Sequence, residues 1–173
     1  MWIDVKIPYE PKNRLDVAYN RAMENTTAEW VLLLDQDVFL CNPLWYKMCL
    51  KTIEKLKGEN VGLISCMTNG PVQKKIQRAD GINSDKIDEH INKSREIFRK
   101  HGLSLQKINV PITGFFMLVN KTVWENVKFE KIKCGVGKID RVFSQRVLDA
   151  GYSIYLMKGL YIYHRRGLRK LKF

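Results

Sequence analysis

The chain of 173 residues carries 30 Lys and Arg against 18 Asp and Glu, which gives a formal net charge of +12, and 45% of its residues are hydrophobic. This length predicts one domain over residues 1–173, and the composition excludes wholesale disorder, collagen-like repeats and a small disulfide scaffold. The positive charge favours anionic partners such as phosphates, nucleic acid or acidic lipid headgroups.

The cysteines and the apolar runs set the expected environment. No Cys-x-x-Cys pair occurs, so reduced, mostly buried thiols are expected at Cys41, Cys49, Cys66 and Cys134. The apolar runs are far shorter than a membrane span, and the first residues lack the basic-then-apolar layout of a signal peptide. We therefore expect no transmembrane segment and a cytoplasmic location, with peripheral membrane contact as an alternative.

In the first part of the chain, short apolar runs alternate with amphipathic segments. Strands are predicted at residues 2–7, 30–34 and 61–66, and helices at residues 14–24 and 43–57. The run at residues 30–34 is apolar throughout, which is typical of a strand buried on both faces. This order predicts a single-domain α/β fold whose central, mostly parallel sheet is flanked by helices on both faces.

The second part begins with a mobile basic loop, predicted near residues 68–82. A helix follows at about residues 84–100, and its thin apolar stripe of Ile87, Ile91 and Phe98 predicts loose packing at an edge. Further elements are predicted as a strand at 112–119, a helix at 139–150, strands at 152–157 and 160–163, and a basic tail at 164–173.

Asp35 and Asp37 directly follow the buried strand at residues 30–34, the place where ligands usually bind in an open α/β sheet. Two residues apart on an extended backbone, their carboxylates share a face and would converge on a hard divalent cation. The alternative is a pair of solvated turn or cap aspartates.

Two further positions are candidates for chemistry. His164 follows a strand-like run and opens a basic segment; it would complete a metal site, while Arg165 and Arg166 would pair with a diphosphate. Asp140 stands near the start of a helix, where a carboxylate of suitable pKa would act as a general base. The alternatives are a surface histidine in a solvated tail and a carboxylate placed favourably at a helix N-terminus.

The aromatic residues allow two interpretations. Tyr152, Tyr155, Tyr161 and Tyr163 fit stacking on nucleic-acid bases and packing in the core equally well. Trp30, Trp45 and Trp124 are expected in the core.

The order of these signals resembles the inverting family 2 glycosyltransferases of the GT-A fold. Residues 16–22 and 29–37 resemble the family's asparagine-bearing helix and its strand ending in Asp-x-Asp. Residues 113–119 resemble the acceptor-side strand, and residues 137–146 the helix that carries the catalytic base.

The resemblance implies a role for each candidate. Asp37 would bind Mn²⁺ or Mg²⁺ directly, Asp35 would contact the ribose or a metal-bound water, and His164 would complete the metal shell. Asp140 would be the catalytic base. Asn20, Arg165 and Arg166 would contact the nucleotide-diphosphate sugar.

The predicted function is therefore metal-dependent transfer of one sugar, with inversion, from a nucleotide-diphosphate sugar to a glycan, lipid-linked or protein acceptor. UDP-sugar is the first choice of donor. The nucleotide base stays open, because only 34 residues precede Asp35, where the family carries a longer unit with an aspartate that reads the base. The alternatives are a basic nucleic-acid-binding domain and a non-catalytic relative that binds sugar nucleotides. No stable nucleic-acid partner is expected for the transferase.

Overall fold

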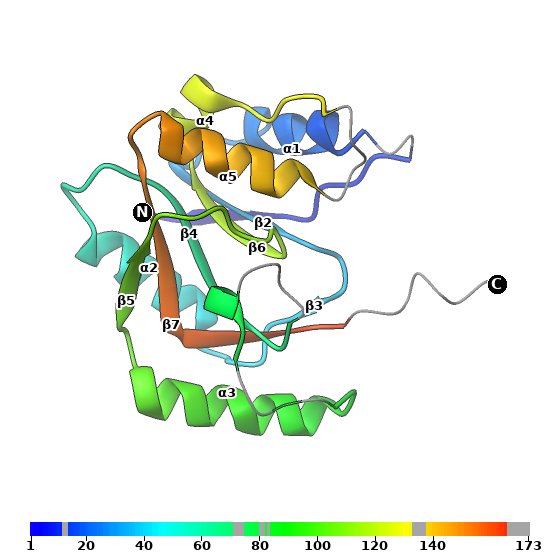
Figure 1. The fold of residues 1–173 in the computed structure, drawn as a ribbon, viewed down its shortest axis with the longest axis vertical. Coiled ribbons are helices and arrows are strands. Elements are labelled where there is room, and N and C mark those ends of the chain that lie inside the picture. Colours follow the sequence, from blue (N-terminus) through cyan, green and yellow to red (C-terminus); the bar gives the residue numbers. More distant parts are fainter. Residues whose placement is uncertain (12–13, 71–74, 80–81, 83, 133–137, 166–173) are drawn as a thin grey trace.

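The computed structural model describes residues 1–11, 14–70, 75–79, 82, 84–132 and 138–165, which form one sheet covered by helices on both faces (Figure 1). The strands are β1 (Ile3–Lys6), β2 (Trp30–Leu34), β3 (Val38–Phe39), β4 (Val61–Thr68), β5 (Leu105–Ile108), β6 (Phe116–Asn120) and β7 (Ser153–His164). The helices are α1 (Leu15–Glu24), α2 (Trp45–Lys55), α3 (Ile87–His101), α4 (Lys121–Val127) and α5 (Ile139–Asp149). The predicted α/β class, with helices on both faces, is confirmed.

The prediction of a mostly parallel sheet is wrong, because the sheet is mixed. Its strand order is β1-β2-β6-β4-β7-β3, with β5 also paired to β7. Among the described strands only β1 with β2 and β4 with β7 pair in parallel; the other four pairings are antiparallel. The reason is β6, which enters between β2 and β4 in the opposite direction and separates two strands that the βαβ order predicts as neighbours.

The strand directions gather several chain ends at one edge. Because β6 is antiparallel to both of its neighbours, β1, β2, β4 and β7 all run the same way. Their carboxyl ends therefore share an edge of the sheet, and β6 begins at that same edge. In open α/β sheets this carboxyl edge is where ligands bind.

The all-apolar β2 is explained by its two covered faces. Val31 and Leu33 pack with α1, α4 and α5 in one core cluster, while Trp30, Leu32 and Leu34 pack with α2 in the other. Since alternate side chains of a strand point to opposite faces, a strand buried on both faces must be apolar at every position.

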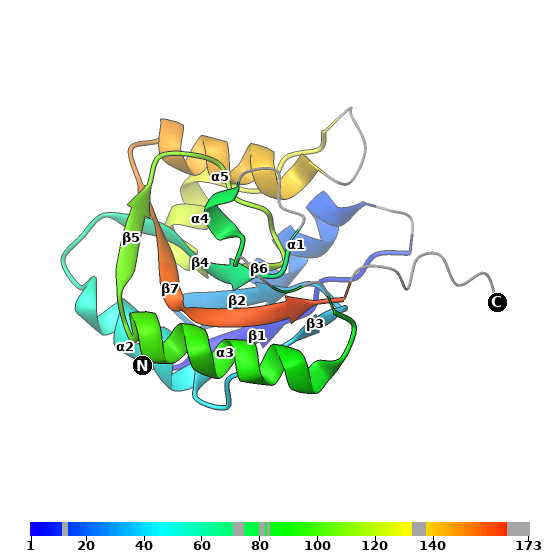
Figure 2. The same cartoon turned by 60° about the horizontal axis from the view of Figure 1, so that its bottom comes forward.

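β7 replaces the two strands predicted at residues 152–157 and 160–163. Its first part pairs with β4 up to Met157 opposite Cys66, and pairing resumes at Tyr161 opposite Met67. Residues 158–160 bulge out between these pairs, and the strand then continues to pair with β3 (Figure 2). An added Cβ on Gly159 would lie 1.9 Å from the carbonyl oxygen of Gly102, so only glycine fits at the bulge.

α3 packs more closely than its predicted apolar stripe suggests. Its buried residues are His90, Ser94 and Ile97. Of the predicted stripe, Ile91 and Phe98 are half-buried and Phe98 packs against the core, but Ile87 is exposed and does not belong to the packed face. His90 stacks on Tyr163 with ring centroids 3.6 Å apart. Its Nε2 donates to the Ser84 carbonyl, so Nδ1 accepts from the Tyr161 hydroxyl, both at 2.7 Å. His90 is therefore buried with both ring nitrogens hydrogen-bonded. A hydrophobicity pattern that treats histidine as polar does not predict this burial.

Several short elements were not predicted. They are β3, β5 and a turn of 3-10 helix at Lys75–Gln77, inside the segment predicted as a mobile basic loop. Gln77 and Ala79 in that segment are buried. The mobility predicted for residues 68–82 stays a prediction, and Lys74 lies outside the described residues.

Most aromatic side chains and the described thiols belong to the core. Tyr155, Tyr161 and Tyr163 are buried, as are Trp30 and Trp124, whereas Trp45 is half-buried. Cys41, Cys49 and Cys66 are free and buried, as predicted, and burial raises the pKa of the Cys49 thiol to about 12. Cys134 lies outside the described residues.

None of the helices described here has the length and apolar character needed to cross a bilayer.

We predict that Gly62→Ala lowers the free energy of unfolding by about 1–3 kcal/mol, because an added methyl over-packs the core. The new Cβ would lie 2.6 Å from Cγ1 of Val147 on α5 and 2.9 Å from Cγ1 of Val123 on α4. Denaturant unfolding measures the effect. The Gly62→Ala/Val147→Ala double variant should lose less stability than the sum of the single changes; strict additivity would contradict this close packing.

Candidate metal centre

Asp35 and Asp37 lie at the carboxyl edge, in the turn that joins β2 to β3. The Asp35 backbone N–H donates to the Phe115 carbonyl at 3.2 Å, which continues the β2–β6 pairing for one more residue. The Asp35 side chain is 36% exposed and that of Asp37 is 18% exposed. The turn therefore holds both carboxylates at the surface of the sheet edge.

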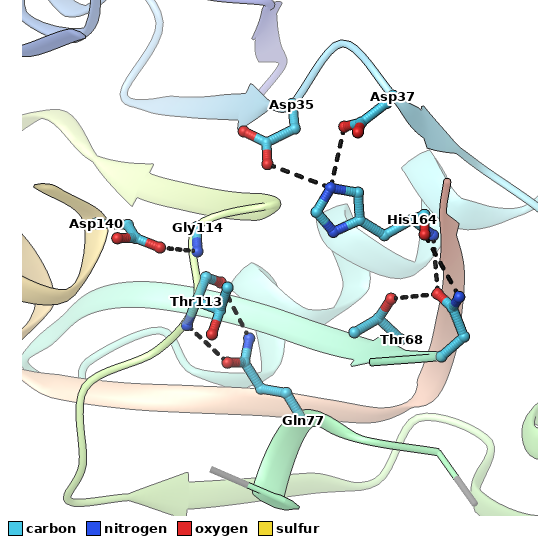
Figure 3. A network of polar contacts seen from close by, with 9 residues as sticks. Asp35, Asp37, Thr68, Gln77, Thr113, Gly114, Asp140 and His164 are labelled. Atoms are coloured by element: carbon cyan, nitrogen blue, oxygen red, sulfur yellow. Dashed lines mark hydrogen bonds and ion pairs between the residues drawn. The ribbon is translucent and has the colours of Figure 1, made fainter. Parts of the chain in front are cut away.

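The last residue of β7, His164, completes a three-residue cluster with these carboxylates (Figure 3). Its Nε2 lies 3.0 Å from Asp37 Oδ1 and 3.6 Å from Asp35 Oδ2. Asp37 and His164 are 127 residues apart in sequence, and they meet because β3 pairs with the end of β7, with Val38 opposite His164. The predicted grouping of these three residues is present in the structure.

The backbone of His164 is held by a side chain that sequence reasoning missed. Asn69, just after β4, accepts a hydrogen bond from the His164 N–H at 3.0 Å and donates one to the His164 carbonyl at 3.4 Å. The Thr68 hydroxyl donates to the same Asn69 oxygen at 3.0 Å. In the sequence, the Asn-Gly pair at residues 69–70 indicates only a turn. The role of Asn69 cannot be seen there, because its partner His164 lies on β7, 95 residues further along the chain.

The donor set suits a hard divalent cation. One ligand atom from each of Asp35, Asp37 and His164 lies within 4.8 Å of the other two. Carboxylate oxygens with one imidazole nitrogen are ligands that Mn²⁺ and, with more water, Mg²⁺ accept. The ring of Phe115 lies 5.8 Å from that of His164, and the buried Nδ1 of His164 has no hydrogen-bond partner among the described residues. Nε2 is therefore the nitrogen that His164 presents to the two carboxylates.

Asp140 stands in the first turn of α5, where the sequence places the candidate base. One carboxylate oxygen accepts from the Gly114 N–H and the other from the Arg141 N–H. Burial raises the pKa of Asp140, and the negative charge of Asp35 raises it further, whereas the backbone hydrogen bonds act in the opposite direction. Glu130, between α4 and α5, is engaged in an ion pair with Arg146 at 2.8 Å.

The contact between Gly114 and Asp140 requires a glycine. An added Cβ on Gly114 would lie 2.4 Å from the Cβ of Asp140 and 3.0 Å from one of its carboxylate oxygens. The strand predicted at residues 112–119 begins only at Phe116, so Gly114 lies in the turn before β6. This turn brings a backbone N–H directly to the carboxylate.

Gln77 fixes the same turn from the other side (Figure 3). Its side chain accepts from the Thr113 N–H at 2.8 Å and donates to the Thr113 carbonyl at 3.3 Å and to the Ser65 hydroxyl at 2.9 Å. Gln77 is buried, although the sequence placed it in a basic loop. A side chain from the segment after β4 therefore positions the backbone that holds Asp140.

Asp140 and the metal cluster share one electrostatic neighbourhood. The negative charge of Asp35 contributes to the raised pKa of Asp140. Burial raises the pKa of Tyr19 on α1, and the charges of Asp35 and Asp140 both raise it further. Hydrogen bonds also place the two residues near each other. The Asp140 carboxylate accepts from the Gly114 N–H, and the Asp35 N–H donates to the carbonyl of the next residue, Phe115. The candidate base and the candidate metal ligands therefore face a common region of the carboxyl edge.

Asn20, predicted to contact the donor, has a structural role in the fold. Its carbonyl oxygen accepts from the Trp124 indole N–H at 2.9 Å and from the Phe129 N–H at 3.0 Å, and its amide donates to the Phe129 carbonyl at 2.8 Å. These bonds tie α1 to α4 and to the residues after it. The amide oxygen and one N–H of Asn20 are engaged in this way, and its contact with the donor stays a prediction.

Of the two predicted arginines, the structure describes Arg165. Arg165 is exposed, and its backbone N–H donates to the Asp37 carbonyl at 2.8 Å, so it stands beside the cluster. Arg166 lies outside the described residues. Comparison with known proteins adds no assignment, since no protein-family model and no curated protein matches this chain.

We predict that Asp37→Asn and His164→Gln each weaken Mn²⁺ binding by at least about tenfold, because each removes one of three ligands. Calorimetric titration of the full chain with Mn²⁺ measures the effect. Asp88→Asn, which neutralises an exposed carboxylate on α3, is the matched control and should bind as the unchanged chain does. Equal affinity in Asp37→Asn and the control would contradict the metal centre.

Proposed function

We propose that this chain is a metal-dependent glycosyltransferase of the GT-A fold, which transfers one sugar from a nucleotide-diphosphate sugar to an acceptor hydroxyl with inversion. The observation that supports it best is the meeting of Asp35, Asp37 and His164 at the carboxyl edge, in the electrostatic neighbourhood of Asp140. The resemblance of residues 29–37 and 137–146 to inverting family 2 glycosyltransferases assigns metal binding and base catalysis to these positions. A UDP-sugar is the first choice of donor.

The donor end of the site would be built from the metal cluster and the arginines beside it. Asp37, Asp35 and His164 would hold Mn²⁺ or Mg²⁺, which when bound neutralises the charge that develops on the leaving diphosphate. Arg165 is exposed next to His164, where its guanidinium would pair with the same diphosphate. Arg166 is proposed for this role from the resemblance alone.

Asp140 would act on the acceptor. Its carboxylate takes the proton of the acceptor hydroxyl while the acceptor oxygen forms a bond to the anomeric carbon. The bond from that carbon to the diphosphate oxygen breaks, and the nucleoside diphosphate leaves with the electron pair. The raised pKa of Asp140 makes it a stronger base than an ordinary aspartate. One displacement from the face opposite the diphosphate inverts the anomeric carbon.

The nucleic-acid-binding alternative keeps its charge arguments and loses most of its aromatic one. The net charge of +12 and the basic tail at residues 164–173 stand. Tyr152 is half-buried, but Tyr155, Tyr161 and Tyr163 are buried, so these three rings are not available to stack on bases. Carboxylates such as Asp35 and Asp37 would repel a phosphate backbone unless a cation intervened. A non-catalytic relative that binds sugar nucleotides is an outcome of the following test.

The experiment that tests the proposal is calorimetric binding of UDP, GDP, CDP and their common sugar conjugates, each with Mn²⁺ and with a chelator. Binding of one nucleotide only in the presence of metal, followed by transfer to an acceptor, supports the transferase. Metal-dependent binding with neither hydrolysis nor transfer supports the non-catalytic relative. Absence of binding to every nucleotide overturns the proposal.

Substitutions at Asp37 and Asp140 separate donor binding from chemistry. We predict that Asp37→Asn weakens Mn²⁺-dependent donor binding by at least about tenfold, because it removes a metal ligand. Asp140→Asn should leave donor affinity within about twofold and abolish measurable transfer, because an amide does not accept the proton. Calorimetry and a transfer assay measure the two effects. Equal loss of donor binding in both variants would contradict the assigned roles.

The pKa of Asp140 predicts a pH dependence of transfer. Only the deprotonated carboxylate takes a proton, so kcat/KM should fall as the pH drops through the raised pKa, above the ordinary aspartate value of about 3.9. Rate profiles at saturating Mn²⁺ measure this. Donor affinity measured over the same pH range is the control for protonation of the metal ligands. If kcat/KM falls at low pH only in parallel with donor affinity, the assignment of this fall to protonation of Asp140 is contradicted.

A further inference from the structure

A cavity of about 370 Å³ lies between α3 and the segment that joins β3 to α2. None of the described residues that line it belongs to the candidate metal centre, and the proposed function does not use this cavity. The lining residues that matter here are Asn42, Leu44, Ser94, Arg95, Phe98 and Arg99.

One part of the lining is apolar. Leu44 is 51% exposed, and the ring of Phe98 is half-buried across the cavity from the segment that carries Leu44. A chain of methylene groups placed between these two side chains would remove apolar surface from water on both partners. The cavity therefore favours a ligand with a hydrocarbon portion.

The polar groups of the lining include donors that are poorly satisfied. Ser94 is 1% exposed, and its hydroxyl has no hydrogen-bond partner in the part of the chain that the structure describes. Among the described residues, the amide of buried Asn42 donates to the Met48 sulfur, a weak acceptor, at 3.5 Å. Since buried polar groups normally find partners, both groups indicate a ligand that brings acceptor oxygens.

The charge of the lining has one sign. Arg95 and Arg99 line the cavity, and no Asp or Glu does so among the described residues. Their side chains contact the Asn92 amide oxygen at 3.3 Å and the Arg95 carbonyl at 3.4 Å, and the ion pairs found among the described residues include neither of them. Two guanidiniums without a carboxylate partner favour an anion with several oxygens, such as a phosphate monoester.

We propose that this cavity binds an alkyl phosphate monoester, with its chain between Leu44 and Phe98 and its phosphate accepting hydrogen bonds from Arg95, Arg99 and the Ser94 hydroxyl. Ser94, Arg95, Phe98 and Arg99 occupy adjacent turns of one helix, so the polar and apolar parts of the ligand are bound by the same element. The site is independent of the proposed function.

The test is calorimetric titration of the full chain with octyl phosphate, below its critical micelle concentration and in the presence of a chelator. We expect saturable binding of one molecule per chain. Inorganic phosphate, which lacks the chain, and octyl glucoside, which lacks the charge, should each bind at least about tenfold more weakly. No saturable binding of octyl phosphate, or equal binding of octyl glucoside, overturns the proposal.

Variants assign the binding to this cavity. The Arg95→Gln/Arg99→Gln double variant should lose at least about tenfold in affinity for octyl phosphate. Lys100→Gln removes a charge from an exposed position of the same helix outside the cavity lining and should bind as the unchanged chain does. Asp37→Asn should bind octyl phosphate with the affinity of the unchanged chain, since it alters only the metal centre. Equal affinity in the double variant and in Lys100→Gln overturns the site.

Ser94→Ala separates binding from folding. Because the Ser94 hydroxyl has no hydrogen-bond partner among the described residues, its removal should leave the midpoint of thermal unfolding unchanged or raised. Affinity for octyl phosphate should nevertheless fall by about threefold or more. Unchanged affinity in Ser94→Ala would remove this hydroxyl from the site.

Sedimentation with phosphatidylcholine vesicles, with and without phosphatidic acid, identifies the source of the phosphate monoester. Co-sedimentation that requires phosphatidic acid and both arginines assigns it to a lipid headgroup. Binding of monomeric octyl phosphate without co-sedimentation assigns it to a free metabolite. Both results support the alkyl phosphate site, and failure of both assays overturns it.

Discussion

The bulge in β7 is the constraint on which the candidate site depends. The strand first lies beside β4 and β5 in the sheet, and after residues 158–160 it continues along β3. This path places His164 opposite Val38, next to Asp37. Without the bulge the β4 register would not change at Met67, and the end of β7 would meet β3 at a different residue. A local irregularity in one strand therefore decides which side chain faces the carboxylates.

Around this edge, two side-chain amides position the backbone, and the backbone positions the candidate ligands and the candidate base. Asn69 holds both polar groups of the His164 backbone, and Gln77 holds both of those of Thr113. The next residue, Gly114, donates to Asp140. Each amide satisfies backbone groups that would otherwise be costly to bury, and it does so with little freedom of orientation. Rigid placement of this kind is what a metal site and a general base need.

The molecule combines a strongly positive chain with acidic groups gathered at one edge. The formal charge is +12, yet Asp35, Asp37 and Asp140 face one region. Burial and the negative charge of Asp35 disfavour the negative charge of Asp140, which raises its pKa, and a cation beside Asp35 would relieve that cost. Arg165 is exposed beside this edge, so a positive side chain stands next to the acidic cluster.

The sequence by itself determined the local features: the buried strand at residues 30–34, the two aspartates after it, the helix that carries Asp140, and the α/β class. These follow from side-chain periodicity, which needs only neighbouring residues. Tertiary structure alone decided the insertion of β6, the partners of Asn69 and Gln77, and the structural role of Asn20. It also decided that His164 meets Asp37 across 127 residues. Strand pairing joins distant segments, and neither order nor register is encoded in the periodicity of a single strand.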